Sequence, residues 1–140
     1  MSYDITLNDP VTKGTIELDA PHQIKGGTYA MNGTNEAWLN ITYNYAEWYY
    51  KDGVFPSRNG KSAGIRTIYG MSGAESIQVL KAAITALENS TDEISDDERQ
   101  QYKERGVTGY WMPTRKNAIK PLYSLLAFAQ MRPDGIWGGD

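Results

Sequence analysis

The sequence contains no cysteine, and this absence excludes two classes of site at once. Without thiols the chain can form neither a disulfide framework nor a cysteine-ligated metal centre. It also has no apolar run of roughly 18 residues, so no membrane-spanning helix is predicted. Its first residues lack the basic region and apolar stretch of a secretory signal. We therefore expect a soluble, cytoplasmic protein that does not associate with a membrane.

Histidine is almost absent as well, because His22 is the only one in the chain. No Ser-His-Asp arrangement is recognisable, and the HExxH, Walker-A, EF-hand and GxGxxG spacings are missing. An acidic segment at 92–98 could bind a divalent cation or cleave a nucleotide, but helix-start carboxylates explain it more simply. We expect no catalytic residue, no cofactor and no metal, and hence no enzyme.

Positive charge is also scarce, since 14 Lys and Arg residues face 17 Asp and Glu residues and the net charge is −3. This balance argues against duplex nucleic acid as the main partner, because duplex binders are normally basic. A small anionic ligand needs only a local positive pocket and stays possible. The 140 residues, 40% hydrophobic and 22% charged, fit a single globular domain over 1–140.

The first third of the chain has the pattern of strands. Tyr3, Ile5 and Leu7 alternate with polar residues, and the segment 15–19 alternates again after a turn signal, so a hairpin is plausible. We expect a short third strand at 28–31. The segment 38–43 is predicted to be a central strand.

Helical patterns dominate from residue 44 onward. A short helix at 44–51 would have Asn44 as its cap, and an exposed loop over 52–64 would follow. Ser72 and Glu75 have the spacing of a capping box, and an apolar stripe follows them. The stripe consists of Ile77, Leu80, Ile84 and Leu87.

Two further helices complete the predicted order. Ser95 and Glu98 repeat the capping-box spacing, and a polar helix should run to about Arg105. The most apolar helix ends at about Met131 and begins at either Thr114 or Asn117. A start near Asn117 puts Pro121 at the end of the first turn, whereas a start at Thr114 would put a kink there. With either start an apolar stripe is expected, formed by Ala118, Leu122, Leu125, Leu126 and Ala129. Strands followed by helices predict an α+β fold: a small antiparallel sheet from the N-terminal third, packed against two long and one or two short helices.

The start of the last helix is the strongest candidate for a ligand site. Helix N-termini attract anions, and this one is preceded by the pair Tyr110 and Trp111. Aromatic rings stack on bases, and arginine binds phosphate in a bidentate manner. The alternative is that the rings pack in the core and the cations are solvated. The predicted ligand-binding residues are Tyr43, Asn44, Arg66, Tyr69, Trp111, Thr114, Arg115 and Asn117.

Four segments of the chain resemble a loose group of small proteins carried by bacteriophages and mobile elements. They are 42–45, 64–71, the Trp-x-Pro-Thr-x-x-Asn-Ala motif at 111–118, and the Met-Arg-Pro-Asp-Gly motif at 131–135. None of these segments is a catalytic signature. Phage proteins of this size include sponges that sequester nucleotide immune signals, and these resemble compact α+β oligomers with pockets of aromatics, arginines and helix N-termini.

The resemblance and the residues together lead to two hypotheses. The first is an oligomeric phage anti-defence protein of the host cytoplasm. It would bind a phosphate-bearing cyclic oligonucleotide or cyclic ADP-ribose isomer without cleaving it, as anti-CBASS and anti-Thoeris sponges do. Tyr43, Arg66 and Trp111 would cover the base, and Arg115 with the Asn117 helix start would hold phosphate. The second is an inhibitor or adaptor that binds a host protein through exposed Trp and Tyr.

Overall fold

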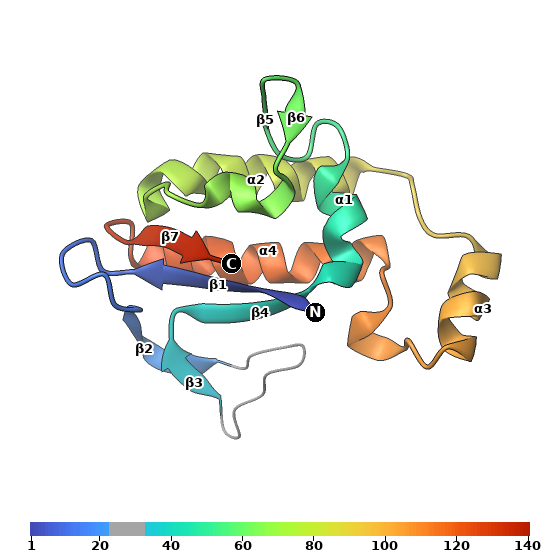
Figure 1. The fold of residues 1–140 in the computed structure, drawn as a ribbon, viewed down its shortest axis with the longest axis horizontal. Helices are drawn as coiled ribbons and strands as arrows, with labels where there is room; N and C mark the ends of the chain where they lie inside the picture. The colour runs from blue at the N-terminus through green and yellow to red at the C-terminus, as the bar shows by residue number, and fades with distance from the viewer. Residues whose placement is uncertain (23–32) are drawn as a thin grey trace.

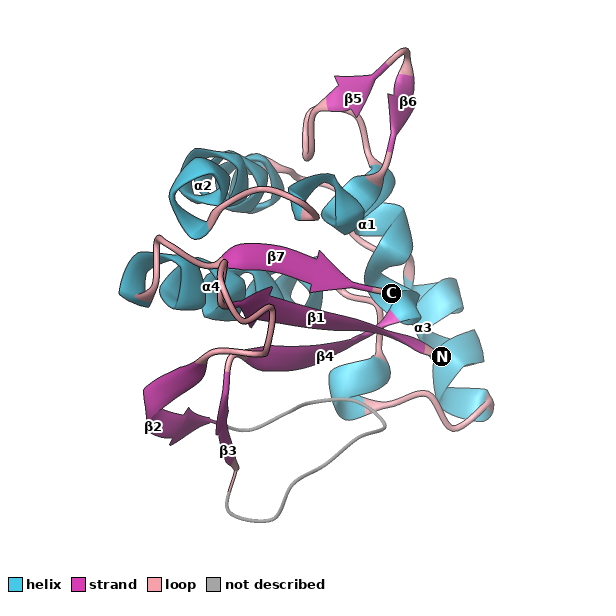
Figure 2. Ribbon diagram, turned by 60° about the vertical axis from the view of Figure 1, so that its left-hand side comes forward, coloured by secondary structure: helices cyan, strands magenta, loops and turns pink. Residues whose placement is uncertain are grey.

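The fold is α+β, with a small antiparallel sheet lying against two long helices (Figures 1 and 2). The structure is a computed structural model that describes residues 1–22 and 33–140, so the strand expected at 28–31 lies outside the described residues. The sheet has the order β4-β1-β7. Its strands are β1 (Ser2–Asn8), β4 (Trp38–Thr42) and β7 (Ile136–Gly139).

The alternation in β1 produces the inner face of the sheet. Tyr3, Ile5 and Leu7 are all buried, and their polar neighbours are more exposed. Within the antiparallel ladders Tyr3 lies opposite Ile41 and Leu7 lies opposite Trp137. The strand predicted at 38–43 is confirmed as β4, but its predicted central position is wrong. β4 lies at one edge of this sheet, because the C-terminal β7 pairs with the other side of β1.

The hairpin predicted for the first two strands forms only at its turn, where the Ile16 N–H donates to the Leu7 carbonyl at 3.0 Å. Thr15 forms only an isolated bridge with Asn8, and β2 (Glu17–His22) pairs with β3 (Thr34–Glu36) in a separate two-stranded sheet. The turn itself forms as expected, because the Asp9 carboxylate accepts hydrogen bonds from two backbone amides of 11–12.

The two long helices, α2 (Gly73–Asn89) and α4 (Arg115–Met131), pack side by side. The capping box between Ser72 and Glu75 is confirmed in both directions. Of the two starts considered for the last helix, the earlier one is correct, since the Thr114 hydroxyl caps α4 and Pro121 lies inside it. The predicted apolar residues of α2 and α4 are buried, except Ile77, which is half-buried; the buried ones are Leu80, Ile84, Leu87, Ala118, Leu122, Leu125, Leu126 and Ala129.

Short elements connect the sheet to the helices. Asn44 does not cap a helix with its side chain; instead its backbone N–H donates to the Thr42 hydroxyl, which caps the first turn (3.2 Å). The loop predicted at 52–64 contains a small projecting hairpin (Figure 2). These elements are η1 (Tyr43–Tyr45), α1 (Ala46–Tyr50), β5 (Ser57–Arg58), β6 (Lys61–Ser62), η2 (Gly64–Ile68) and η3 (Gly109–Trp111).

Helix α3 (Asp96–Glu104) stands apart from the rest of the chain (Figure 1). It is capped by Ser95 as predicted, it ends next to Arg105, and none of its residues is buried. Its position is therefore not fixed by the hydrophobic core. Among the described residues, no helix has both the length and the apolar character needed to cross a membrane.

The N-terminus of α2 should tolerate no side chain at Gly73. A Cβ there would lie 2.6 Å from the backbone oxygen of Arg132, in the turn that follows α4. Alanine normally favours a helix by about 1 kcal/mol over glycine, but this contact forces backbone to move. We expect Gly73→Ala to lower the free energy of unfolding by about 1–3 kcal/mol in urea titrations. Gly14→Ala is the control, since its Cβ would meet only the Thr12 hydroxyl at 3.6 Å; equal effects would contradict the packing argument.

Candidate functional site

The backbone of 109–113 is held in place by side chains, and every carbonyl in this segment accepts a hydrogen bond from one. Asn117, in the first turn of α4, contributes two of these bonds. Its Nδ2 atom donates to the carbonyl oxygens of Gly109 and Met112, each at 3.0 Å. The start of α4 and the segment before it are thereby fixed to each other.

The other three carbonyls are bound by side chains from the segment that follows β4. Asn44 Nδ2 donates to the Trp111 carbonyl at 2.9 Å, and the Tyr45 hydroxyl donates to the Tyr110 carbonyl. The indole N–H of Trp48 donates to the carbonyl of residue 113 at 2.9 Å. We call this set of bonds the carbonyl clamp; its donors are Asn44, Tyr45, Trp48 and Asn117.

Three of the predicted ligand-binding residues therefore have structural partners. Asn44 and Asn117 use their amide N–H groups in the carbonyl clamp, and the Thr114 hydroxyl caps α4. Trp111 behaves differently, because its carbonyl is bound while its side chain is 46% exposed. The clamp thus presents an indole ring to the solvent from a fixed backbone.

The guanidinium of Arg115, at the start of α4, already donates hydrogen bonds to backbone carbonyls. Its guanidinium donates to the carbonyl oxygen of Leu87, in the last turn of α2, at 2.9 Å. It also donates to the carbonyl oxygen of Asp92, just after α2, at 3.2 Å. Cations at a helix C-terminus interact favourably with the helix dipole. The backbone N–H of Arg115 donates to Glu93. Arg115 therefore connects α4 to the end of α2, and its geometry does not suit a phosphate contact.

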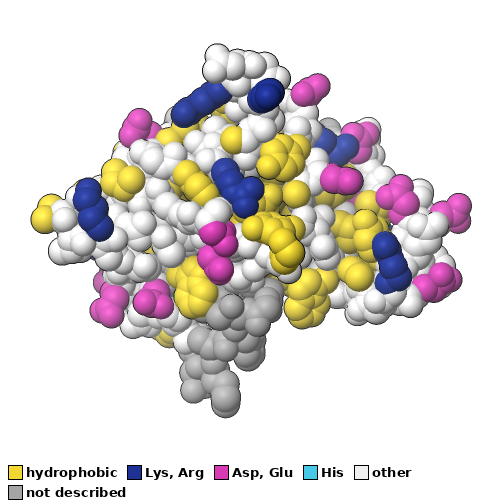
Figure 3. All heavy atoms as spheres, viewed as in Figure 1, with side chains coloured by type: hydrophobic (Ala, Val, Ile, Leu, Met, Phe, Trp, Pro, Cys, Tyr) yellow, Lys and Arg dark blue, Asp and Glu magenta, His cyan; other side chains and the backbone are white. Residues whose placement is uncertain are grey.

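Tyr43, Arg66 and Tyr69 form a second group, which lies in space beside Asp140, the last residue of the sequence. The guanidinium carbon of Arg66 lies 4.8 Å from the ring centre of Tyr3, and Arg66 Nη2 donates to the Tyr43 hydroxyl at 3.3 Å. Arg66 and Tyr69 both donate to the carbonyl oxygen of Asp140, at 2.8 and 3.2 Å. In the view of Figure 3, hydrophobic and acidic side chains lie around a basic side chain near the centre of the molecule.

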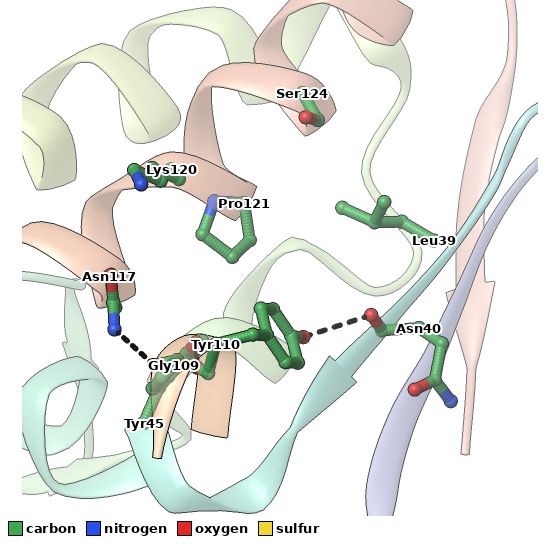
Figure 4. A pocket seen from close by; sticks show the side chains of 9 residues that line it. All are labelled: Leu39, Asn40, Tyr45, Gly109, Tyr110, Asn117, Lys120, Pro121 and Ser124. Carbon is green, nitrogen blue, oxygen red and sulfur yellow. Dashed lines mark hydrogen bonds between the residues drawn. The ribbon is translucent and has the colours of Figure 1, made fainter. Parts of the chain in front are cut away.

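A pocket of about 540 Å³ lies between α4, η3 and β4 (Figure 4). This volume is typical of sites for small molecules, which are roughly 300–1,000 Å³. Of the eight predicted residues only Asn117 lines it. The described lining residues are Leu39, Asn40, Tyr45, Gly109, Tyr110, Asn117, Lys120, Pro121 and Ser124.

Sequence reasoning missed Lys120 and Ser124, although a signal for both was present. They follow Asn117 by three and seven residues, and this spacing puts all three on one helical face. Lys120 is exposed at the pocket, and Ser124 is half-buried. Had the face of Asn117 been extended along α4, both residues would have been found.

Tyr110 forms the wall of the pocket nearest to β4. Its hydroxyl donates to the Asn40 carbonyl at 3.3 Å (Figure 4). It also accepts from the Thr42 N–H at 3.2 Å. Its ring packs edge-on against Tyr45, with 5.6 Å between the ring centres. Burial raises the pKa of both phenols above the ordinary value, so both hydroxyls are neutral at pH 7.

The pocket combines rings with a few polar groups and one cation. The rings of Tyr110 and Pro121 give it apolar walls, while Lys120 and Ser124 supply an ammonium and a hydroxyl. Such a lining suits a ligand that has both a planar ring and an anionic group. Among the described residues, no group of three or more carboxylates or histidines could hold a metal ion.

No family model matches the chain, and neither a curated protein nor a solved structure matches it. The resemblance to small phage proteins therefore stays a prediction from the four sequence segments.

The carbonyl clamp should contribute measurably to stability. Asn117→Ala removes the donor of two carbonyls at once, and each unsatisfied group costs about 1–3 kcal/mol. We expect the free energy of unfolding to fall by about 2 kcal/mol in urea titrations. Asn89→Ala, at the exposed end of α2, is the matched control and should change it by about 0.5 kcal/mol or less. Similar values for the two variants would mean that the clamp does not hold this segment.

Proposed function

We propose that the protein binds a small phosphate-bearing nucleotide signal in the pocket between α4, η3 and β4. As a phage anti-defence protein it would withhold the signal from a host effector. The observation that carries this proposal is the juxtaposition of the Tyr110 ring with Lys120 in a cavity of about 540 Å³. A nucleotide offers the matching groups, a flat base and a negatively charged phosphate.

The proposed phosphate contact is Lys120, which takes the role that the sequence suggested for Arg115. Arg115 uses its donors on carbonyls at the end of α2, whereas Lys120 is exposed at the mouth of the pocket. The base would lie against Tyr110, and the Ser124 hydroxyl would offer a hydrogen bond to the ligand. Tyr43, Arg66 and Tyr69 lie outside this set, because Arg66 contacts Tyr3 and Asp140 instead.

Sequestration without cleavage is the mode of action that these groups support best. The lining offers binding groups, and the hydroxyls of its phenols Tyr45 and Tyr110 already donate to backbone carbonyls, so neither is placed to act as a base on a ligand. The clamp fixes the Tyr110 backbone before a ligand arrives, which reduces the entropy lost on binding. A sponge benefits from such preorganisation because it must compete with a host receptor.

Titration calorimetry with cyclic dinucleotides and with cyclic ADP-ribose isomers tests the proposal. We expect binding of at least one of them, and Lys120→Met should weaken it about tenfold, equivalent to about 1.4 kcal/mol. Lys116→Met is the matched control, because Lys116 is exposed on the same helix but does not line the pocket. Intact ligand recovered after denaturation would agree with sequestration. Absence of heat with every probe, at tens of micromolar protein, would overturn the proposal.

A second candidate function is binding to a host protein through Trp111. The observation that favours it is that this indole is 46% exposed while its backbone is clamped by Asn44. Tryptophan is enriched among the residues that dominate protein interfaces. We expect that Trp111→Ala would abolish capture of a partner from host lysate while leaving nucleotide titrations unchanged. Loss of nucleotide binding in this variant would instead connect Trp111 to the pocket.

A further inference from the structure

A smaller cavity, of about 280 Å³, lies between helix α3 and the start of α4. It adjoins the pocket proposed for the nucleotide, because Gly109 and Asn117 line both of them. Its other walls come from α3, which contributes Arg99 and Lys103, and from the connection between α3 and α4. A ligand that fills the larger pocket can therefore reach the smaller cavity by extending past the two shared residues.

The charge of the smaller cavity is positive. Arg99 and Lys103 line it, and no Asp or Glu is among its described lining residues. Arg99 is half-buried, yet no described group forms an ion pair or a hydrogen bond with its guanidinium or with the Lys103 ammonium. An anion in this cavity would therefore meet charged donors that no other part of the described chain uses.

The spacing of the two cations on α3 is a further reason to expect an anion. Arg99 and Lys103 are four residues apart, so they lie on one face of the helix, about one turn from each other. Like charges at this spacing destabilise a helix. None of the four carboxylates of α3 lines the cavity to compensate. A phosphate bound between the two cations would remove their repulsion.

Two hydroxyl groups complete the polar lining. Thr108 contributes one of them, and the Thr114 oxygen accepts the N–H of Asn117, which leaves its own proton to be donated to a ligand. The N-terminus of α4 is not itself the anion site, because the Glu93 carboxylate already takes the N–H of Arg115. The cations of α3 therefore supply the charge of this cavity, and the hydroxyls add hydrogen-bond donors.

The two cavities lie at different positions along α4. Thr114 lines the smaller one, and Lys120, the cation of the larger pocket, follows six residues later. At about 1.5 Å per residue these positions are about 9 Å apart along the helix axis. Two phosphates separated by a ribose match such a spacing better than a pyrophosphate, in which the two phosphorus atoms share one oxygen atom.

We propose that the smaller cavity is a second phosphate subsite and that the ligand is a dinucleotide with two phosphates, an inference that rests on the proposed function. Lys120 would bind one phosphate, while Arg99 and Lys103 would bind the other together with the Thr114 hydroxyl. None of the residues of α3 is buried, so the core does not fix its position. A dinucleotide would hold α3 against the start of α4.

Titration calorimetry with cyclic di-AMP and cyclic di-GMP, each compared with the cyclic mononucleotide of the same base, tests the inference. We expect at least one dinucleotide to bind about tenfold or more tightly than its mononucleotide, because only the dinucleotide reaches both cavities. Arg99→Gln should weaken dinucleotide binding about threefold to tenfold and leave mononucleotide binding unchanged. Arg105→Gln is the matched control, because it removes the same charge at the end of α3 from a residue outside both cavities. Lys120→Met should weaken both kinds of ligand.

The outcomes separate this inference from the proposed function. If a dinucleotide binds but Arg99→Gln and Arg105→Gln have equal effects, the second subsite is wrong and the nucleotide pocket stands. The same holds if Arg99→Gln weakens the mononucleotide as much as the dinucleotide. A cyclic ADP-ribose isomer that binds more tightly than both dinucleotides would also overturn the inference alone, since its phosphates form a pyrophosphate. If no nucleotide binds, both proposals are overturned.

Discussion

The organisation of the molecule depends on the hydrogen bonds that side chains donate to the carbonyls of 109–113. Without them this short turn would leave a row of backbone acceptors without partners just before α4, and each lost partner is costly when it is buried. The donors Asn44, Tyr45 and Trp48 all belong to the segment after β4, so the clamp joins the sheet edge to α4. Tyr110 and Trp111 are the two rings that it positions.

The clamp also relates the two cavities of the proposed site. Its donor Asn117 and its acceptor Gly109 line both of them. Both cavities contain cations, because the larger one has the Lys120 ammonium and the smaller one has Arg99 and Lys103. A ligand in the larger cavity would contact groups that the clamp has already fixed, so it would not need to order this segment.

The segment after α4 is held to the rest of the fold by close packing and not by the clamp. The turn after α4 packs so closely on the first residue of α2 that only glycine fits at position 73. It then leads into β7, whose Trp137 is buried against β1 and donates to the Ser76 hydroxyl at 2.7 Å. The last strand therefore connects the sheet to the long helices, and Arg66 reaches the same end of the chain through Asp140.

Local patterns in the sequence determined the α+β class, the caps at Ser72 and Ser95, and the apolar stripes of α2 and α4, because these depend on neighbours within a few residues. They left the start of α4 open between Thr114 and Asn117. Only the tertiary structure decided which strand is central, since β7 pairs with β1 across almost the whole chain. It also decided the roles of the predicted site residues. Asn44, Arg115 and Asn117 have the chemistry of ligand contacts, but backbone carbonyls take their donors, and those bound by Asn44 and Arg115 are distant in the sequence. Sequence spacing cannot reveal which carbonyl a long polar side chain will reach.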